Sequence, residues 1–162
     1  MAAQAGALVL GTAGRTKQEQ ARKLGAQHVV DSTDPDWQRR LSEHLGERTV
    51  DVVFESIGGE SATGLLDLMT PLRGRMVHYG MLSGLPAAVT AMDLMSRGLT
   101  LTGCGGLAFH ARLAETRRQA IDFAASGRLV PLVDTTLPLE HAAEAHRLIE
   151  AREHRGMVVL TP

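Results

Sequence analysis

The sequence predicts a doubly wound α/β fold, in which helices cover both faces of a mainly parallel sheet. Short apolar runs, bounded by glycines and polar residues, alternate with helical segments along the whole chain. This alternation is typical of strand-helix-strand units that build a parallel sheet. No linker or shift in composition divides the sequence, and its 162 residues are enough to bury a sizeable core. We therefore predict one domain over residues 1–162.

The predicted strands are apolar runs that end at turn-forming residues. They cover residues 7–12, 28–31, 50–55, 75–79, 99–103, 131–137 and 157–160. The run at residues 50–55 is nearly continuous in apolar side chains, which predicts a buried strand. The run at residues 99–103 alternates Leu with Thr, which predicts a strand with one less-buried side.

The predicted helices lie between these strands. They cover residues 16–24, a segment opening at Asp34, a segment around 65–69, and residues 92–96, 112–126 and 139–151. Asp34 is the expected N-cap of the second helix, with Pro35 in its first turn. Trp37, Leu41 and Leu45 recur every fourth residue and form its buried stripe.

Composition excludes several classes of function. The formal net charge is -1 and the basic residues are scattered, so we expect no nucleic-acid partner. No apolar stretch approaches the roughly 18–20 residues that span a bilayer, so we expect no membrane partner. The single cysteine, Cys104, can form neither an internal disulfide nor a zinc site alone, which fits the reducing cytoplasm. We expect no metal site, and no partner residue makes Cys104 a nucleophile.

Six short blocks of sequence, five of which contain glycine, lie in and around the predicted strands. They are Gly11-Thr-Ala-Gly14, Ala21-Arg-Lys-Leu-Gly-Ala26, His28-Val-Val-Asp31, Val50-Asp-Val-Val-Phe-Glu-Ser-Ile-Gly-Gly59, Gly74-Arg-Met-Val-His-Tyr-Gly80 and Ser83-Gly84. In this order they resemble the zinc-free quinone oxidoreductase branch of the medium-chain dehydrogenase/reductase superfamily. The resemblance spans nearly the whole chain and continues into its last helix and strand. It implies a Rossmann-like domain that holds NADP(H) without zinc.

Two features of that family are missing from the sequence. A complete member begins with a catalytic domain, followed by a strand and a glycine-rich turn that holds the cofactor pyrophosphate. In the strand order 3-2-1-4-5-6, the missing strand would lie between the strands at residues 7–12 and 50–55. We expect that the sheet closes by new pairing, that another chain supplies a strand, or that the chain is a fragment of a longer protein.

The predicted cofactor site begins with cationic residues after the first strand. Arg15 and Lys17 occupy the loop where Rossmann-like domains hold a 2′-phosphate, and an acidic residue there would select NAD instead. The resemblance implies the same, because family members carry Lys at the position of Lys17. A solvated helix start is the alternative. By resemblance Ser32 borders the adenosine, although the usual aromatic neighbour is missing.

Two more turns follow the carboxyl ends of predicted strands, where open parallel sheets bind ligands. By resemblance these turns border the ribose and nicotinamide, and ordinary turn chemistry is the alternative. Their residues are Ser56, Ile57 and Gly58 in the first turn, and Tyr79, Gly80, Met81 and Leu82 in the second.

The strand from Leu99 to Gly103 resembles the family's edge strand, which implies a homodimer that pairs two such edges. Three functions remain open: part of an NADPH-dependent quinone or enone oxidoreductase, a non-catalytic dimerising or nucleotide-binding module, and one chain of a split reductase. No catalytic residue is assigned. Because the pyrophosphate turn is missing, we expect neither strong NADPH binding nor turnover by this chain alone.

Overall fold

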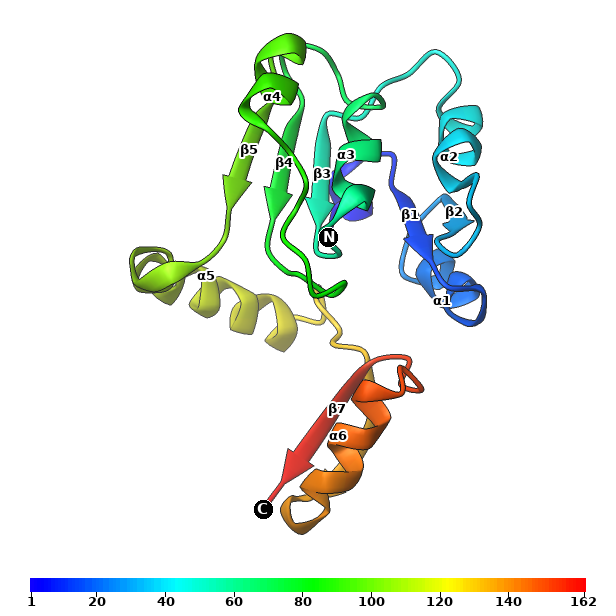
Figure 1. Cartoon of the computed structure of the whole chain (residues 1–162). Helices are drawn as coiled ribbons and strands as arrows, with labels where there is room; N and C mark the ends of the chain where they lie inside the picture. Colours follow the sequence, from blue (N-terminus) through cyan, green and yellow to red (C-terminus); the bar gives the residue numbers. More distant parts are fainter. The chain divides into compact units, whose positions relative to one another are not determined.

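The computed structural model describes residues 1–162, which form two compact units. The larger consists of Gly6–Leu113 with Ala2, and the smaller of Ala114–Pro162 with Met1 and Ala3–Ala5. Figure 1 labels the helices and strands. The single domain over residues 1–162 stays a prediction.

The larger unit alternates strands with helices, as the sequence predicts. Its elements are β1 (Leu10–Ala13), the 3-10 turn η2 (Arg15–Lys17), α1 (Gln18–Lys23), β2 (His28–Asp31), α2 (Trp37–Leu45), β3 (Val52–Glu55), α3 (Glu60–Leu66), β4 (Arg75–His78), α4 (Ala91–Arg97), β5 (Thr100–Gly103) and the start of α5 (Gly106–Ala125). A 3-10 turn, η1 (Ala3–Ala5), precedes them. All strand pairs are parallel, so the predicted α/β class is confirmed.

The strands of the larger unit form two separate sheets. One has the order β1-β2 and the other the order β3-β4-β5, and no ladder joins β1 to β3. Both strands that flank the expected gap therefore lack one partner, as predicted. The expectation that the sheet closes by new pairing is wrong for this structure. Each sheet packs against its own helices, α1 and α2 on β2 and α3 near β3.

The three-stranded sheet carries the main core. One face packs against α3 and the segment around α4, burying Val53, Ala62, Leu66, Met69, Met76 and Leu99. Leu66 and Met76 are completely enclosed. The other face of β3 is open, because Val52 is 37% exposed and Phe54 is 69% exposed. The prediction of a buried strand at residues 50–55 is therefore wrong for Val52 and Phe54, because helices cover only the other face of β3.

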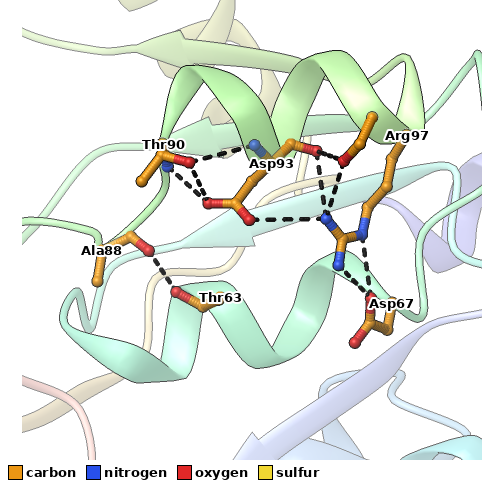
Figure 2. A network of polar contacts seen from close by, with 7 residues as sticks. Thr63, Asp67, Ala88, Thr90, Asp93 and Arg97 are labelled. Carbon is orange, nitrogen blue, oxygen red and sulfur yellow. Dashed lines mark hydrogen bonds and ion pairs between the residues drawn. The ribbon is translucent and has the colours of Figure 1, made fainter.

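Polar contacts join α3 to α4 beside this core (Figure 2). Thr90 and Asp93 form a capping box at the start of α4, with the Asp93 N–H donating to the Thr90 hydroxyl at 3.2 Å. Arg97 donates from Nη2 and Nε to Asp67 Oδ1, at 2.7 and 3.0 Å. The hydroxyl of Thr63 on α3 donates to the carbonyl of Ala88. These contacts orient α4 on the sheet.

Most helix starts differ from the sequence prediction, among them those of α2 and α5. Helix α2 has Asp36 at its N-cap rather than Asp34. The Asp34 carboxylate instead accepts the Asp36 N–H at 2.9 Å, which makes a local turn that delays the helix. Helix α5 begins at Gly106 rather than Arg112.

The smaller unit contains the rest of α5, β6 (Val133–Pro138), the 3-10 turn η3 (Leu139–His141), α6 (Ala142–Glu150) and β7 (Met157–Thr161). β6 and β7 pair in parallel, with an irregularity between Val133 and Thr135. Its one buried apolar residue is Ala145. None of the helices in the structure combines the length and apolar character needed to span a membrane.

Candidate functional site

The carboxyl ends of β1 and β2 bring the predicted phosphate-binding residues to one edge. Ala13 and Asp31 are opposite each other in the parallel register, so the segments after them meet. Arg15 and Lys17 follow β1 in η2, and Ser32 follows β2, where its N–H donates to the Ala13 carbonyl at 3.2 Å. The Arg15 side chain is 90% exposed and Lys17 is half-buried. These are positions from which cations could reach a phosphate.

Asp31 is a residue of this edge that sequence reasoning missed. Its Oδ2 lies 3.4 Å from Arg15 Nε. The hydroxyl and backbone N–H of Thr33 lower the pKa of Asp31 below its ordinary value, and Arg15 lowers it further. The carboxylate offsets part of the local positive charge, which leaves Lys17 as the cation without an acid partner. An acid that ends a predicted strand next to a basic loop is the signal that could have identified it.

The turns after β3 and β4 lie against each other. The Leu82 N–H donates to the Ser56 carbonyl at 2.9 Å, and the Ser83 N–H donates to the Ile57 carbonyl at 2.8 Å. The structure therefore brings together the two groups that the sequence predicts to border a ribose and a nicotinamide. Their large side chains are open to solvent, with exposures of 44% for Ile57, 54% for Tyr79, 57% for Met81 and 64% for Leu82. Neighbouring exposed apolar side chains can cover a planar ring of a ligand.

Glycines make the close approach of these turns possible. Gly58 has a φ of +78°, and a Cβ there would lie 2.0 Å from the Leu85 carbonyl oxygen. A Cβ on Gly80 would lie 3.0 Å from the Ser56 carbonyl oxygen. No side chain fits at Gly58 without displacing the loop that follows β4.

Beneath the turns lies a second feature that sequence reasoning missed. Glu55 ends β3 and His78 ends β4, opposite each other in the register. Their side chains meet, with His78 Nδ1 2.6 Å from Glu55 Oε2. Glu55 is only 3% exposed, which is unusual for a carboxylate without a function in the fold or the site. An acid at the last position of a predicted buried strand is the sequence signal that points to it.

No group of three or more His, Cys, Asp and Glu side chains could hold a metal ion. The expected absence of zinc stays a prediction. A hollow of about 330 Å³ lies away from both candidate edges, between the end of α3 and α4. Its charged residues, Asp67 and Arg97, are already paired with each other. It is therefore not part of the candidate site.

A model of the zinc-binding dehydrogenase family matches residues 24–160. The chain belongs to this family. Within it, the fold and the order of blocks correspond to the nucleotide-binding part of the medium-chain quinone oxidoreductases, which confirms the resemblance.

Two relatives with similar sequences are named as a reductase and an oxidoreductase. The chain is 33% identical over 163 residues to a 2-haloacrylate reductase from a Burkholderia species, covering 97% of this chain and 49% of that protein. It is 32% identical over 166 residues to quinone oxidoreductase 1 of Escherichia coli, covering 97% of this chain and 50% of that protein. The chain thus spans about half the length of these relatives.

One solved structure with a similar fold contains NADPH. The crystal structure of Escherichia coli quinone oxidoreductase complexed with NADPH superimposes with a TM-score of 0.84 and 31% sequence identity. The match covers 99% of this chain and 51% of that chain. The fold of this chain therefore matches the nucleotide-binding domain of the medium-chain quinone oxidoreductases.

Proposed function

We propose that this chain is the nucleotide-binding part of an NADPH-dependent reductase that passes hydride to a quinone or to an α,β-unsaturated carbonyl. The observation that carries the proposal is the adjacency of the two turns after β3 and β4, in a fold shared with an NADPH-bound quinone oxidoreductase. The chain would supply cofactor placement, and chemistry in this reaction class belongs largely to the cofactor. Substrate contacts and catalytic groups would come from the half that the relatives have in addition.

Preference for NADPH over NADH is assigned to Lys17, with Arg15 as a weaker contributor because Asp31 shares its charge. The test is a titration of the ¹⁵N-labelled chain with each nucleotide, followed by amide shifts. Shifts at Lys17, Ser56 and Tyr79 are expected at millimolar NADPH, with smaller shifts for NADH. The Lys17→Ala variant should lose the difference between the nucleotides.

The matched control for this titration is Lys23→Ala, because Lys23 lies on α1 and pairs with Glu19 at 2.8 Å. This variant should bind like the unaltered chain. Absence of any shift at the turns after β3 and β4, at millimolar NADPH, would overturn the cofactor assignment.

Two alternatives share this cofactor chemistry but not the activity: a non-catalytic nucleotide-binding module and one chain of a split reductase. Both alternatives are consistent with the missing ladder between β1 and β3, because a strand from another chain could fill that gap. Mixing the chain with NADPH and a quinone and following absorbance at 340 nm tests the first of these alternatives. We expect no turnover by the chain alone, and turnover would eliminate the module.

A homodimer through the outer edge of β5 is part of the proposal. The N–H groups of Thr100 and Cys104 donate to the neighbouring Gly74 and His78 carbonyls, so those of Leu101 and Gly103 face the open edge. Gly103→Pro removes one outward donor without changing the core. It should shift the chain toward monomer in light scattering coupled to size-exclusion chromatography. A dimer of unchanged stability would place the contact elsewhere.

A further inference from the structure

The Glu55 carboxylate occupies the inside of the turn that follows β3. Its Oε1 accepts the N–H of Ile57 at 2.7 Å and the N–H of Gly58 at 2.8 Å. Only 3% of the residue is exposed, so water does not compete for these donors. The turn is thus folded around a buried acceptor that belongs to its own strand.

The second oxygen of Glu55 reaches the neighbouring strand. Oε2 lies 2.6 Å from His78 Nδ1, and a carboxylate oxygen only accepts, so Nδ1 is the donor. His78 immediately precedes Tyr79, the first residue of the second turn. One carboxylate therefore links the backbone of the first turn to the base of the second.

The direction of these bonds limits what the first turn can bind. The N–H groups of Ile57 and Gly58 point inward to Glu55 and are not available to an anion. Ile57 instead presents a side chain that is 44% exposed. A turn of this kind meets a neutral ring or a sugar hydroxyl better than it meets a phosphate.

We propose that Glu55 and His78 are positioning residues that hold the turns at residues 56–58 and 79–82 as one rigid surface for the ribose and nicotinamide part of the cofactor. The purpose assigned to this surface rests on the proposed function. We call the hydrogen bonds of Glu55 to the first turn and to His78 the clamp. The clamp is a property of the free chain, because both Glu55 oxygens already accept hydrogen bonds without a cofactor. Neither residue has to touch the cofactor to act in this way.

The test is amide hydrogen exchange by NMR on the full chain without nucleotide. His78→Ala removes the donor to Oε2 and leaves Glu55 free to swing toward solvent. Exchange of the Ile57 and Gly58 amides should accelerate about tenfold, the effect of losing one hydrogen bond to a charged group. The Met76 amide, in the core of the same sheet, should keep its rate.

Two further variants make the result specific. His78→Asn retains a side-chain N–H near the position of Nδ1 and should restore slow exchange in the turn. His141→Ala removes an exposed contact with Glu144 of 3.3 Å, in the smaller unit, and should leave the turn unchanged. Three results would overturn the proposal. In His78→Ala they are equally faster exchange at Met76, or unchanged exchange at Ile57 and Gly58. The third is fast exchange in His78→Asn, as in His78→Ala.

Addition of NADPH to the same samples separates this inference from the proposed function. Weaker NADPH-induced shifts in His78→Ala, restored in His78→Asn, support both. If NADPH perturbs no amide of the unaltered chain, the proposed function fails, while the exchange pattern in the turn still decides whether the clamp exists.

Discussion

The block formed by β3, β4, β5, α3 and α4 and the smaller unit at residues 114–162 have similar elements but very different interiors. In the first block six apolar side chains lie in one cluster, and three of them, Ala62, Leu66 and Met76, are almost completely enclosed. In the smaller unit only Ala145 is buried, although β6, α6 and β7 follow one another as regularly. Large apolar side chains there stay exposed, among them Ile121 at 68%, Val130 at 75% and Met157 at 50%.

This difference shows that a strand-helix-strand pattern does not by itself produce a core. A third strand gives the first block a sheet face wide enough for α3 to cover, whereas β6, β7 and α6 together bury only Ala145 among their apolar residues. The first block also carries the candidate cofactor turns at its carboxyl edge. We therefore expect stability and site geometry to depend on the same residues in this block.

The largest expected effect is the difference in the free energy of unfolding between two methionine variants, one in β4 and one in β7. Met76→Ala in β4 empties a fully enclosed position and should lower the free energy of unfolding by about 2–5 kcal/mol. Met157→Ala in β7 changes a half-exposed position and should cost below about 0.5 kcal/mol. Urea unfolding followed by circular dichroism measures both. Similar losses would mean that Met157 is buried in solution, and would contradict the difference in burial between the first block and the smaller unit.

The next effect concerns the close approach of the two turns. Gly84 has a φ of +82° and open space around it, so Gly84→Ala should cost about 1–2 kcal/mol from the left-handed backbone alone. Gly58→Ala adds the collision with the Leu85 carbonyl and should cost about 1–3 kcal/mol more. Thermal unfolding of both variants gives the difference. Equal losses would show that the loop after β4 can move away freely.

A smaller effect is expected for ion pairs. A double-mutant cycle of Arg97→Ala and Asp67→Ala should give a coupling of about 0.5–1 kcal/mol, because Arg97 bonds Asp67 through two nitrogens from a one-third exposed position. The control cycle uses Arg118 and Glu115 in the smaller unit, both well exposed, and should give a coupling near zero. Raising the salt concentration should reduce the first coupling. A larger coupling for the control would reverse the comparison.

The smallest effect is a shift in titration. The Thr90 hydroxyl, the Thr90 N–H and Arg97 hold the pKa of Asp93 below its ordinary 3.8. Because the folded pKa is lowered, the stabilisation is present above pH 3.8 and is lost as the pH falls through the folded pKa. Thr90→Val removes the largest cause and should raise the Asp93 pKa toward 3.8 in a carbon-13 NMR titration.

Thr63→Val is the control for this titration, because Thr63 bonds the Ala88 carbonyl and not Asp93. It should leave the Asp93 midpoint in place. An unchanged midpoint in Thr90→Val would remove the hydroxyl as the cause of the lowered pKa.

Much of the strand pattern could be predicted, because each strand is a local apolar run. The strand at residues 28–31 has its predicted bounds, and that at residues 75–79 differs by one residue. Helix starts were less predictable. Asp34 and Asp36 are both good N-caps, and the hydrogen bond between them decides that α2 starts after Asp36. The turns at Ser56 and Tyr79 were predictable from their place after strands. Glu55 and His78 were not, because they lie 23 positions apart and meet only through the register of β3 and β4.

The sequence by itself determined the alternation of strands and helices, the parallel class of the sheet and the position of the candidate turns. These properties follow from periodicity and from glycines at strand ends, which act over a few residues. Only the tertiary structure decided that β1 and β3 do not pair with each other, that one face of β3 stays open, and that Glu55 lies beneath both turns. These outcomes depend on which distant segments pack together, and burial is a property of that packing rather than of any single segment.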